Sequence, residues 1–289
     1  MNFGKTLLFL LLLLPVLVSL EAEEIRIAVS DLLADTIEGP LEAFVEGNDL
    51  TFTIDSIGSL PALDRLRSDE IDLAIIAVPD GDEVPRQEFS VYPFVYDVVV
   101  IAVNESNPID EISLSYLGGI FGSNEEYNFN TWGDMNLSGW GNRNIKPLAG
   151  TREGGIALEL FRYRVFKGGV MKPNVSMVRD SEIEDLLRSD AASIGILSNL
   201  SDKSQVKVLM VSEEEGAPAF GPSEDNVHYG DYPISLAFYI VYNERDKLKL
   251  RPVVRELLND DVAASLRQND LVPLPDTVRR KLLIDLDLQ

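Results

Sequence analysis

Cysteine is absent from this sequence of 289 residues. Its absence excludes disulfide bonds, thiolate metal ligands, a cysteine nucleophile and a lipidated N-terminal cysteine. An exported chain is free to use disulfides, so a chain without them depends on its hydrophobic core. Roughly 100 to 200 residues make a domain, and the length therefore suits two lobes or one large α/β unit.

Histidine is nearly absent as well, because His228 is the single one and lies in a polar segment. A Ser/His/Asp triad would have to use His228, and no G-x-S-x-G sequence is present to support one. Zinc sites need clustered histidine or cysteine. Acidic runs such as 80–83 and 213–215 lack the spaced ligands of a calcium loop. We therefore predict that the chain is not an enzyme and holds no cofactor or metal ion.

Basic residues are scarce, since 25 lysines and arginines stand against 48 aspartates and glutamates and leave a formal net charge of −23. A field of this sign repels nucleic acid and anionic membrane surfaces. It does not exclude an anionic ligand, because backbone N–H groups at helix N-termini hold anions without carrying a net charge. We predict no nucleic-acid partner.

The N-terminal segment 1–22 has the pattern of a secretory signal peptide. Lys5 supplies a short basic region, and 7–20 is an apolar run that contains Pro15. The run is shorter than the roughly 20 residues that span a bilayer, which favours an export signal over the alternative, a retained anchor. Cleavage after Ser19 or Ala22 would leave a periplasmic protein.

Strand-like and helix-like segments alternate along the first half of the chain. Strands are expected at 25–29, 50–57 and 71–78, with one helix ending near Val45 and another starting at Ser59. The third strand is a continuous apolar run, which indicates a parallel strand covered on both faces. This alternation predicts an α/β fold with mostly parallel sheets.

The second half continues the pattern, with a helix expected to open at Gly150 and Thr151. Two lobes without a linker rich in glycine, serine or proline must be joined through strands. The segments 98–104 and 239–243 are the candidates for these two crossings. Further strands are expected at 92–103, 193–197, 206–211 and 234–242.

Taken in order, these segments resemble the phosphate-binding component of phosphate ABC transporters, a family of type II periplasmic binding proteins. They cover nearly the whole chain after residue 22 in collinear order, which is more specific than any single motif. The segments that carry the resemblance are 28–44, 58–66 with 71–74, 117–121 with 132–134, 150–152 with 160–161, 193–196, and 230–235 with 239–243.

The resemblance implies a two-lobed type II periplasmic binding protein fold with a cleft between the lobes. It places one lobe at 23–98 with 240–289 and the other at 99–239. It implies a monomer that captures phosphate, or a related oxyanion, for uptake through an ABC permease. The ligand-binding residues that it implies are Ser30, Asp31, Gly58, Ser59, Gly150, Thr151 and Arg152.

Several positions depart from the family pattern. Ala149 stands where the family has serine, Leu236 where it has arginine, and Ala77 where a hydroxyl is expected after Ile75 and Ile76. These lost donors favour either a pocket rebuilt for another oxyanion or a small organic acid, or a scaffold or sensor that no longer binds phosphate.

Most candidate residues have structural alternatives. Ser59 is equally suited to cap its helix, and Asp31 is equally suited to capping or to accepting a proton from bound phosphate. Arg152 pairs either with the ligand or, on the surface, with a neighbouring glutamate. Three helix N-termini, after Ser30, at Ser59 and at Gly150, are expected to converge on the cleft.

Export predicts a shorter mature chain. Intact-mass analysis of protein recovered from the periplasm is expected to show the loss of about 19 to 22 residues, the span set by the two small-residue cleavage sites. Recovery of the full-length chain in the membrane fraction would contradict this and support an N-terminal anchor.

Overall fold

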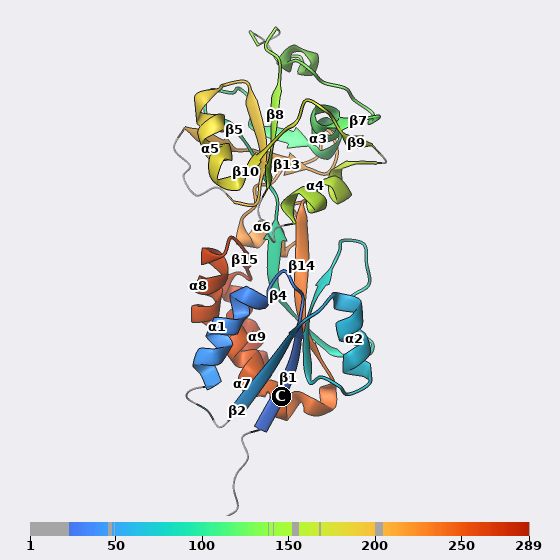
Figure 1. The fold of residues 1–289 in the computed structure, drawn as a ribbon, viewed down its shortest axis with the longest axis vertical. Coiled ribbons are helices and arrows are strands. Elements are labelled where there is room, and N and C mark those ends of the chain that lie inside the picture. The colour runs from blue at the N-terminus through green and yellow to red at the C-terminus, as the bar shows by residue number, and fades with distance from the viewer. Residues whose placement is uncertain are drawn as a thin grey trace, which may run out of the picture.

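The computed structural model describes residues 23–45, 48, 50–137, 139–140, 142–151, 156–167, 169–199 and 205–288, so the predicted signal peptide lies outside it. Two β-sheets, each flanked by helices, lie one above the other along the long axis of the molecule (Figure 1). We call the part with the six-stranded sheet the lower lobe and the part with the five-stranded sheet the upper lobe. The predicted two-lobed α/β fold is confirmed. Within the described ranges, no helix combines the length and apolar character needed to cross a bilayer.

The sheet of the lower lobe has the strand order β15-β4-β14-β3-β1-β2. β1, β2 and β3 are parallel, and the other strands join through antiparallel pairs, so the sheet is mixed rather than mostly parallel. The strands are β1 (Glu23–Val29), β2 (Leu50–Ser56), β3 (Leu73–Val78), β4 (Ser90–Val98), β14 (Ser235–Tyr242) and β15 (Val272–Pro273). The helices are α1 (Ala34–Val45), α2 (Ser59–Arg67), α7 (Lys247–Leu257), α8 (Asp260–Gln268) and α9 (Asp276–Leu288), with the short 3₁₀ helix η2 (Glu244–Asp246) before α7.

β3 is covered on both faces, as its continuous apolar run predicts. Alternate side chains of a strand point to opposite faces of the sheet. Leu73 and Ile75 pack in the hydrophobic cluster that includes α1, α7 and α8. Ala74 and Ile76 pack in a separate cluster with Leu63 of α2.

A carboxylate with little exposure fixes the start of β3. Asp72 accepts hydrogen bonds from the backbone N and the Nε of Arg26 in β1, at 2.9 and 3.0 Å, and from Lys249 Nζ in α7, at 3.0 Å. Burial raises the pKa of Asp72, but the bonds from Arg26 and Lys249 outweigh it and lower the pKa from 3.8 to about 2. Asp72 therefore ties β1, β3 and α7 together.

The sheet of the upper lobe has the strand order β10-β8-β11-β5-β12. β8, β10 and β11 are parallel, whereas β5 and β12 join antiparallel. Its strands and those of two small two-stranded sheets are β5 (Val100–Asn104), β6 (Glu111–Ser113), β7 (Gly122–Ser123), β8 (Lys146–Thr151), β9 (Val170–Met171), β10 (Ser176–Arg179), β11 (Ser193–Leu197), β12 (Val206–Val208) and β13 (Met210–Ser212). The helices are α3 (Leu114–Phe121), η1 (Trp132–Met135), α4 (Ala157–Val165) and α5 (Asp180–Ser189), and α6 (Glu224–His228) lies on the way back to the lower lobe.

The chain crosses between the lobes at two places. The apolar run 92–103, expected as one strand, is two strands in different sheets, and the first crossing is at Val99 between β4 and β5. The crossing expected at 239–243 is wrong, because β14 lies wholly in the lower sheet and the chain returns at 232–234. This run is apolar because β14 is a central strand between β3 and β4.

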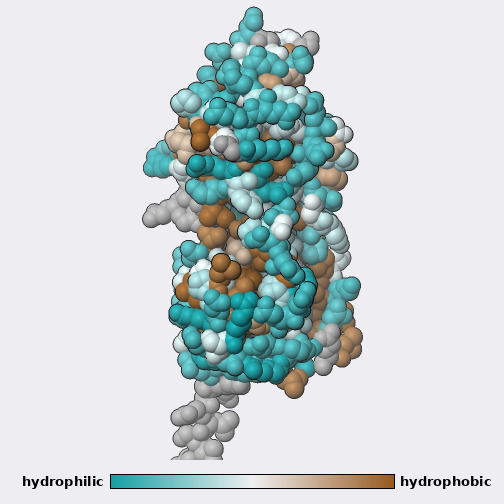
Figure 2. Space-filling model, turned by 90° about the vertical axis from the view of Figure 1, so that its right-hand side faces the viewer, coloured by the Kyte–Doolittle hydropathy of each residue, from teal (hydrophilic) through white to brown (hydrophobic). Residues whose placement is uncertain are grey.

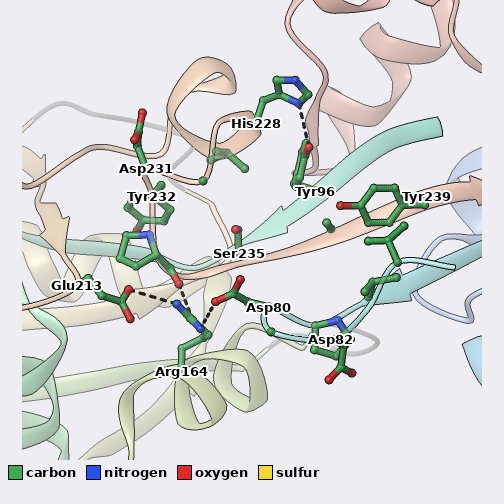
Figure 3. A pocket seen from close by; sticks show the side chains of 18 residues that line it. Asp80, Asp82, Tyr96, Arg164, Glu213, His228, Asp231, Tyr232, Ser235 and Tyr239 are labelled. Atoms are coloured by element: carbon green, nitrogen blue, oxygen red, sulfur yellow. Dashed lines mark hydrogen bonds and ion pairs between the residues drawn. The ribbon is translucent and has the colours of Figure 1, made fainter. Parts of the chain in front are cut away.

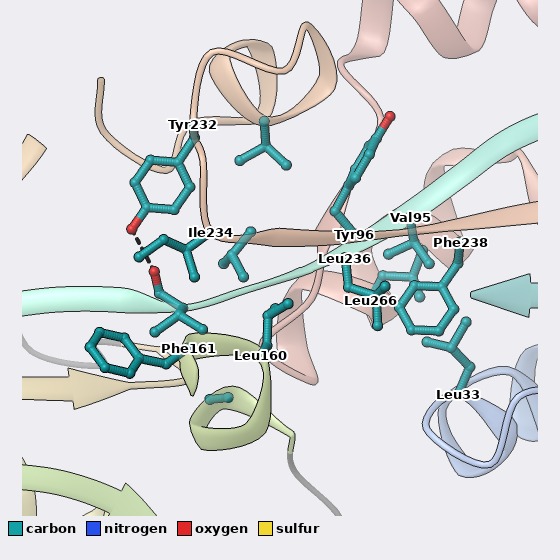
Figure 4. Packing of buried hydrophobic residues seen from close by; sticks show 14 of the residues in the cluster. Leu33, Val95, Tyr96, Leu160, Phe161, Tyr232, Ile234, Leu236, Phe238 and Leu266 are labelled. Atoms are coloured by element: carbon teal, nitrogen blue, oxygen red, sulfur yellow. Dashed lines mark hydrogen bonds between the residues drawn. The ribbon is translucent and has the colours of Figure 1, made fainter. Parts of the chain in front are cut away.

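The two crossing segments, Val99 and 232–234, are bonded to each other, and we call this region between the lobes the waist. Val99 N donates to Ile234 O at 3.0 Å, and the Tyr232 hydroxyl donates to Val99 O at 2.5 Å (Figure 4). The hydrophobic cluster continues through the waist, with Leu160 of α4 on the upper side and Phe238 of β14 on the lower side. The lobes thus share one core where the chain crosses.

Replacement of Asp72 by asparagine is expected to lower the free energy of unfolding by about 1–2 kcal/mol near neutral pH, since its partners are partly exposed. The pKa of the carboxyl is lower in the folded chain than in the unfolded one. Its contribution to the free energy of unfolding is therefore present above pH 3.8 and is lost as the pH falls toward about 2. Urea unfolding measures the free energy of unfolding of both proteins. The difference between variant and wild type is expected to be smaller at about pH 3 than near neutral pH. Asp55→Asn, which removes an exposed pair with Arg65, is the control, and an Asp72 gap that does not change with pH would contradict the assignment.

Candidate binding cleft

The parallel strands of both lobes end at edges that face the waist. The residue after β3, Pro79, lines a cavity together with Arg164 of the upper lobe. The residue after β11, Ser198, lines another cavity together with Arg267 of the lower lobe. Strands parallel to these end at the same edge, so the ends of β1, β2, β8 and β10 also face the waist. Ligands of α/β proteins bind at the carboxyl ends of parallel strands.

Ser30 and Asp31 follow β1 at the lower edge. Ser30 is buried, with 3% exposed, and its backbone N donates to Ile75 O of β3 at 2.9 Å. Its hydroxyl lies 3.5 Å from Asp31 Oδ1, and Asp31 is exposed. The helix expected directly after Ser30 begins at Ala34, because a turn separates it from the strand.

Gly58 and Ser59 lie between β2 and α2. Gly58 is the N-cap residue, and Ser59, for which capping was the alternative, is already helical. Ser59 Oγ accepts a hydrogen bond from Ala77 N of β3 at 2.9 Å, and no acceptor for its own proton is found in the described part of the chain. The hydroxyl is thereby oriented and keeps a donor for a ligand. It lines a cavity of about 320 Å³ on the face of β3 that packs against α2.

Gly150 and Thr151 end strand β8, whereas the sequence predicted that they begin a helix. The next helix, α4, begins at Ala157. The strand forms because β8 is paired on both sides, by β10 and β11. Thr151 Oγ1 donates to Val178 O of β10 at 3.0 Å, so its proton is already used. Arg152, the remaining candidate, lies outside the described residues.

A carboxylate lies against Gly150 at the upper edge. A Cβ on Gly150 would be 2.0 Å from Asp180 Oδ1, and Asp180 accepts a hydrogen bond from the hydroxyl of Ser198. Gly150, Thr151, Asp180 and Ser198 line one cavity of about 120 Å³, with Glu159 beside them. Sequence reasoning missed Asp180 because it lies 30 residues after Gly150 and reaches it only through the parallel pairing of β10 and β8.

A cavity of about 480 Å³ lies between the lobes and contains none of the six candidate residues that are described. Its walls come from the loop after β3, from α4 and from the returning segment (Figure 3). Four carboxylates and one arginine line it: Asp80, Asp82, Glu213, Asp231 and Arg164. The charge of this cavity therefore does not suit an anion.

The single histidine lies at the same cavity. His228 Nδ1 is 2.9 Å from the hydroxyl of Tyr96, and burial lowers the pKa of His228. Burial also raises the pKa of Tyr96. Both side chains are thus neutral near neutral pH, and in the described part of the chain neither forms a hydrogen bond with a serine that a triad would need. In the described ranges, no three His, Asp or Glu side chains are grouped so that they could hold a metal ion.

The candidate residues thus lie on both sides of the waist, and Ser59 lines a different cavity from Gly150 and Thr151. Ser30 and Ser59 are both bonded to β3, through Ile75 and Ala77. Gly150 and Thr151 lie across the waist in the upper lobe. Seen from the side, apolar residues gather at the waist between two largely polar lobes (Figure 2).

A family model described as a PBP superfamily domain matches residues 19–259 of the chain. Among curated proteins, the chain is 26% identical over 252 residues to Protein SphX of Synechococcus elongatus, with 82% of this chain and 74% of that protein covered.

Solved structures share the two-lobed fold. A crystal structure of a possible phosphate binding protein from Planctomyces limnophilus has a TM-score of 0.69 at 15% identity, with 92% of this chain and 98% of that chain covered. An ABC-type phosphate transport receptor from Vibrio cholerae has a TM-score of 0.61 at 17% identity, with 87% and 99% covered. At these identities the likeness shows the fold alone.

The two glycines of the candidate loops are expected to respond differently to alanine. Gly150→Ala places a methyl group 2.0 Å from Asp180 Oδ1 and 3.0 Å from Ile196 O, which is expected to cost about 1–3 kcal/mol. Gly58→Ala meets only Pro61 Cδ at 3.8 Å with φ at −65°, so no loss is expected. Thermal unfolding of both variants is the measurement, and equal melting temperatures would show that Asp180 is not held against Gly150.

Proposed function

The chain belongs to the PBP superfamily, and on that basis we propose that it captures phosphate, or a related oxyanion, between its two lobes for ABC-type uptake. Binding rather than catalysis is proposed, with the protein exported and acting as a monomer. We take 23–98 with 235–288 as one lobe and 99–234 as the other, which moves the second boundary to the start of β14.

The observation that carries the proposal is the pair of strand edges at the waist. Each edge presents backbone and hydroxyl groups at the carboxyl ends of parallel strands, where such folds bind ligands. Backbone N–H groups and hydroxyls bind an oxyanion without a net charge. Ser59 supports this most directly, because Ala77 N orients its oxygen and leaves its proton available.

Solved neighbours support phosphate as the ligand. The two neighbours above are described as a possible phosphate binding protein and a phosphate transport receptor, and a third, from Clostridium perfringens, is described with bound phosphate. A permease partner is proposed on the same ground, since the Vibrio cholerae protein is described as an ABC-type receptor.

Asp180 replaces Asp31 as the proposed acceptor for a phosphate proton. It lies against Gly150 in the cavity that Thr151 also lines, whereas Asp31 is exposed. A carboxylate accepts a hydrogen bond from a protonated oxyanion and repels one that carries no proton. The site is thereby expected to prefer phosphate and arsenate over sulfate. Arg152, the remaining candidate of the sequence analysis, is proposed to supply the compensating charge.

Calorimetric titration with phosphate, arsenate, sulfate and molybdate is expected to show one phosphate per chain. Ser59→Ala in the lower lobe removes the hydroxyl whose proton is available and is expected to weaken binding about 10- to 150-fold, the value of a hydrogen bond to a charged group. Thr151→Val in the upper lobe removes a hydroxyl whose proton bonds Val178 O, so a smaller loss of affinity is expected. Thr53→Val on the exposed face of β2 is the matched control and is expected to bind phosphate as the wild type does.

The outcomes separate the proposals. If none of the four anions binds at millimolar concentration, the chain is a scaffold or sensor that kept the fold. If phosphate binds equally well to Ser59→Ala and to the wild type, the anion lies elsewhere than at the start of α2. Thr151 also bonds Val178, so the melting temperature of each variant is measured to separate lost binding from lost stability.

A further inference from the structure

A single arginine spans the cavity between the lobes. Arg164 lies in the last turn of α4, and its side chain is 15% exposed. Its Nε donates to Pro233 O at 2.7 Å, its Nη1 to Asp80 Oδ2 at 2.6 Å and its Nη2 to Glu213 Oε2 at 3.3 Å (Figure 3). Among the described residues that line this cavity, no other lysine or arginine is present.

The three acceptors come from different parts of the molecule. Glu213 follows β13 in the upper lobe, which also contains α4. Pro233 belongs to the segment that returns to the lower lobe, and Asp80 follows β3 in the lower lobe. The Arg164–Asp80 pair therefore crosses from lobe to lobe, whereas the Arg164–Glu213 pair stays within one.

We propose that Arg164 and Asp80 form an interlobe latch that restricts the angle between the lobes of the unliganded protein. The latch requires no ligand. Its effect on anion affinity rests on the proposed function, because only a protein that binds between its lobes is sensitive to their spacing.

The pair joins the lobes beside the bonded crossing. The crossing segments are tied at Val99 and Ile234, so relative rotation of the lobes turns about the waist. Arg164 also bonds Pro233 O in the returning segment, which fixes its guanidinium next to that axis. Asp80 lies on the loop after β3, outside the crossing segments, so the Arg164–Asp80 contact stretches or breaks when the lower lobe rotates relative to the returning segment.

The guanidinium is oriented before it meets Asp80. Pro233 O and Glu213 hold two of its nitrogens, and a planar fork that is already positioned loses little freedom on forming one further bond. Other hydrogen bonds also join the lobes: Asn199 Nδ2 donates to Asp270 Oδ1 at 2.5 Å, Arg267 Nε donates to Glu224 Oε1 at 2.7 Å, and the Tyr96 hydroxyl lies 2.9 Å from His228 Nδ1. Loss of the latch is therefore expected to widen the range of lobe angles rather than to free the lobes.

Spin labels on the two lobes test the latch without any ligand. The chain has no cysteine, so Met177→Cys in β10 and Leu248→Cys in α7, both exposed, give one label on each lobe. Double electron–electron resonance then measures the distance distribution in four backgrounds: wild type, Asp80→Asn, Asp82→Asn and Glu213→Gln. A fifth background, Asp80→Lys, places a like charge opposite Arg164.

Asp80→Asn is expected to broaden the distribution, and Asp80→Lys to shift it to a new distance. Asp82→Asn removes the same charge from the same loop and cavity, and Glu213→Gln removes the intralobe partner of the same arginine. Both are expected to retain the wild-type distribution. A wild-type distribution in Asp80→Asn and Asp80→Lys would overturn the latch, as would equal broadening in Asp82→Asn.

Phosphate titration of the same variants forms a separate arm. If the protein binds phosphate, Asp80→Asn is expected to bind it up to about fivefold more weakly, since fewer molecules hold the lobes at the required spacing. If neither the wild type nor any variant binds phosphate, arsenate, sulfate or molybdate, the proposed function fails while the distance measurement still decides the latch.

Discussion

The bonded crossing at the waist is the constraint on which the rest of the architecture depends. β4 and β14 are antiparallel neighbours, and Ser235 pairs with Val98, so the outgoing and returning segments leave the lower sheet side by side. Val99 and Ile234 then continue the contact beyond the sheet. Two adjacent tethers that are bonded to each other allow rotation about the waist but resist separation. The strand ends of both lobes therefore stay opposite one another at any lobe angle.

Because the protein carries a strong negative charge, an anion is expected to bind where uncharged hydrogen-bond donors are available. The cavity between the lobes carries four carboxylates against Arg164, which is already paired with two of them. The strand ends differ, because Ser59 and the backbone around it offer donors that carry no charge. Asp180 at the upper end is compatible with an oxyanion only if that anion brings a proton. Asp180, which lies in a different cavity from the four interlobe carboxylates, thus narrows the choice toward a protonated anion.

Local sequence patterns predicted most strands within each lobe, but they did not predict where the chain crosses between the lobes. The apolar run of β3 indicated a strand buried on both faces, and β11 forms at 193–197 as expected, because each pattern reflects burial within one lobe. The run 92–103 could not reveal its break at Val99, since an apolar residue suits a strand and a buried crossing equally well. Thr151 was expected in a helix, but pairing of β8 on both sides favours the strand.

The positions of Ser30, Gly58 and Ser59 after strands were predictable from the sequence, whereas contacts between segments that are distant in the sequence were not. Asp180 reaches Gly150 through strand pairing within the upper lobe, and Arg164 meets Asp80, 84 positions away, only after both lobes have formed. No motif marks either contact, because neither depends on its neighbours in the sequence. That Ser30, Gly58 and Ser59 bind the anion stays a prediction.

The latch and a bound anion act on the same coordinate, the angle between the lobes. An anion held by both strand edges must fix that angle, and part of its binding energy opposes the entropy of doing so. A contact that already restricts the angle reduces this cost if the restricted angle resembles the bound one, and increases it otherwise. By linkage, an anion that favours the latched angle also strengthens the Arg164–Asp80 pair by the same factor. A scaffold that had lost its ligand would use the same pair differently, since a fixed lobe angle presents a constant surface to a partner. The carboxylates of the cavity between the lobes would then oppose no binding event, because no anion would need to approach them.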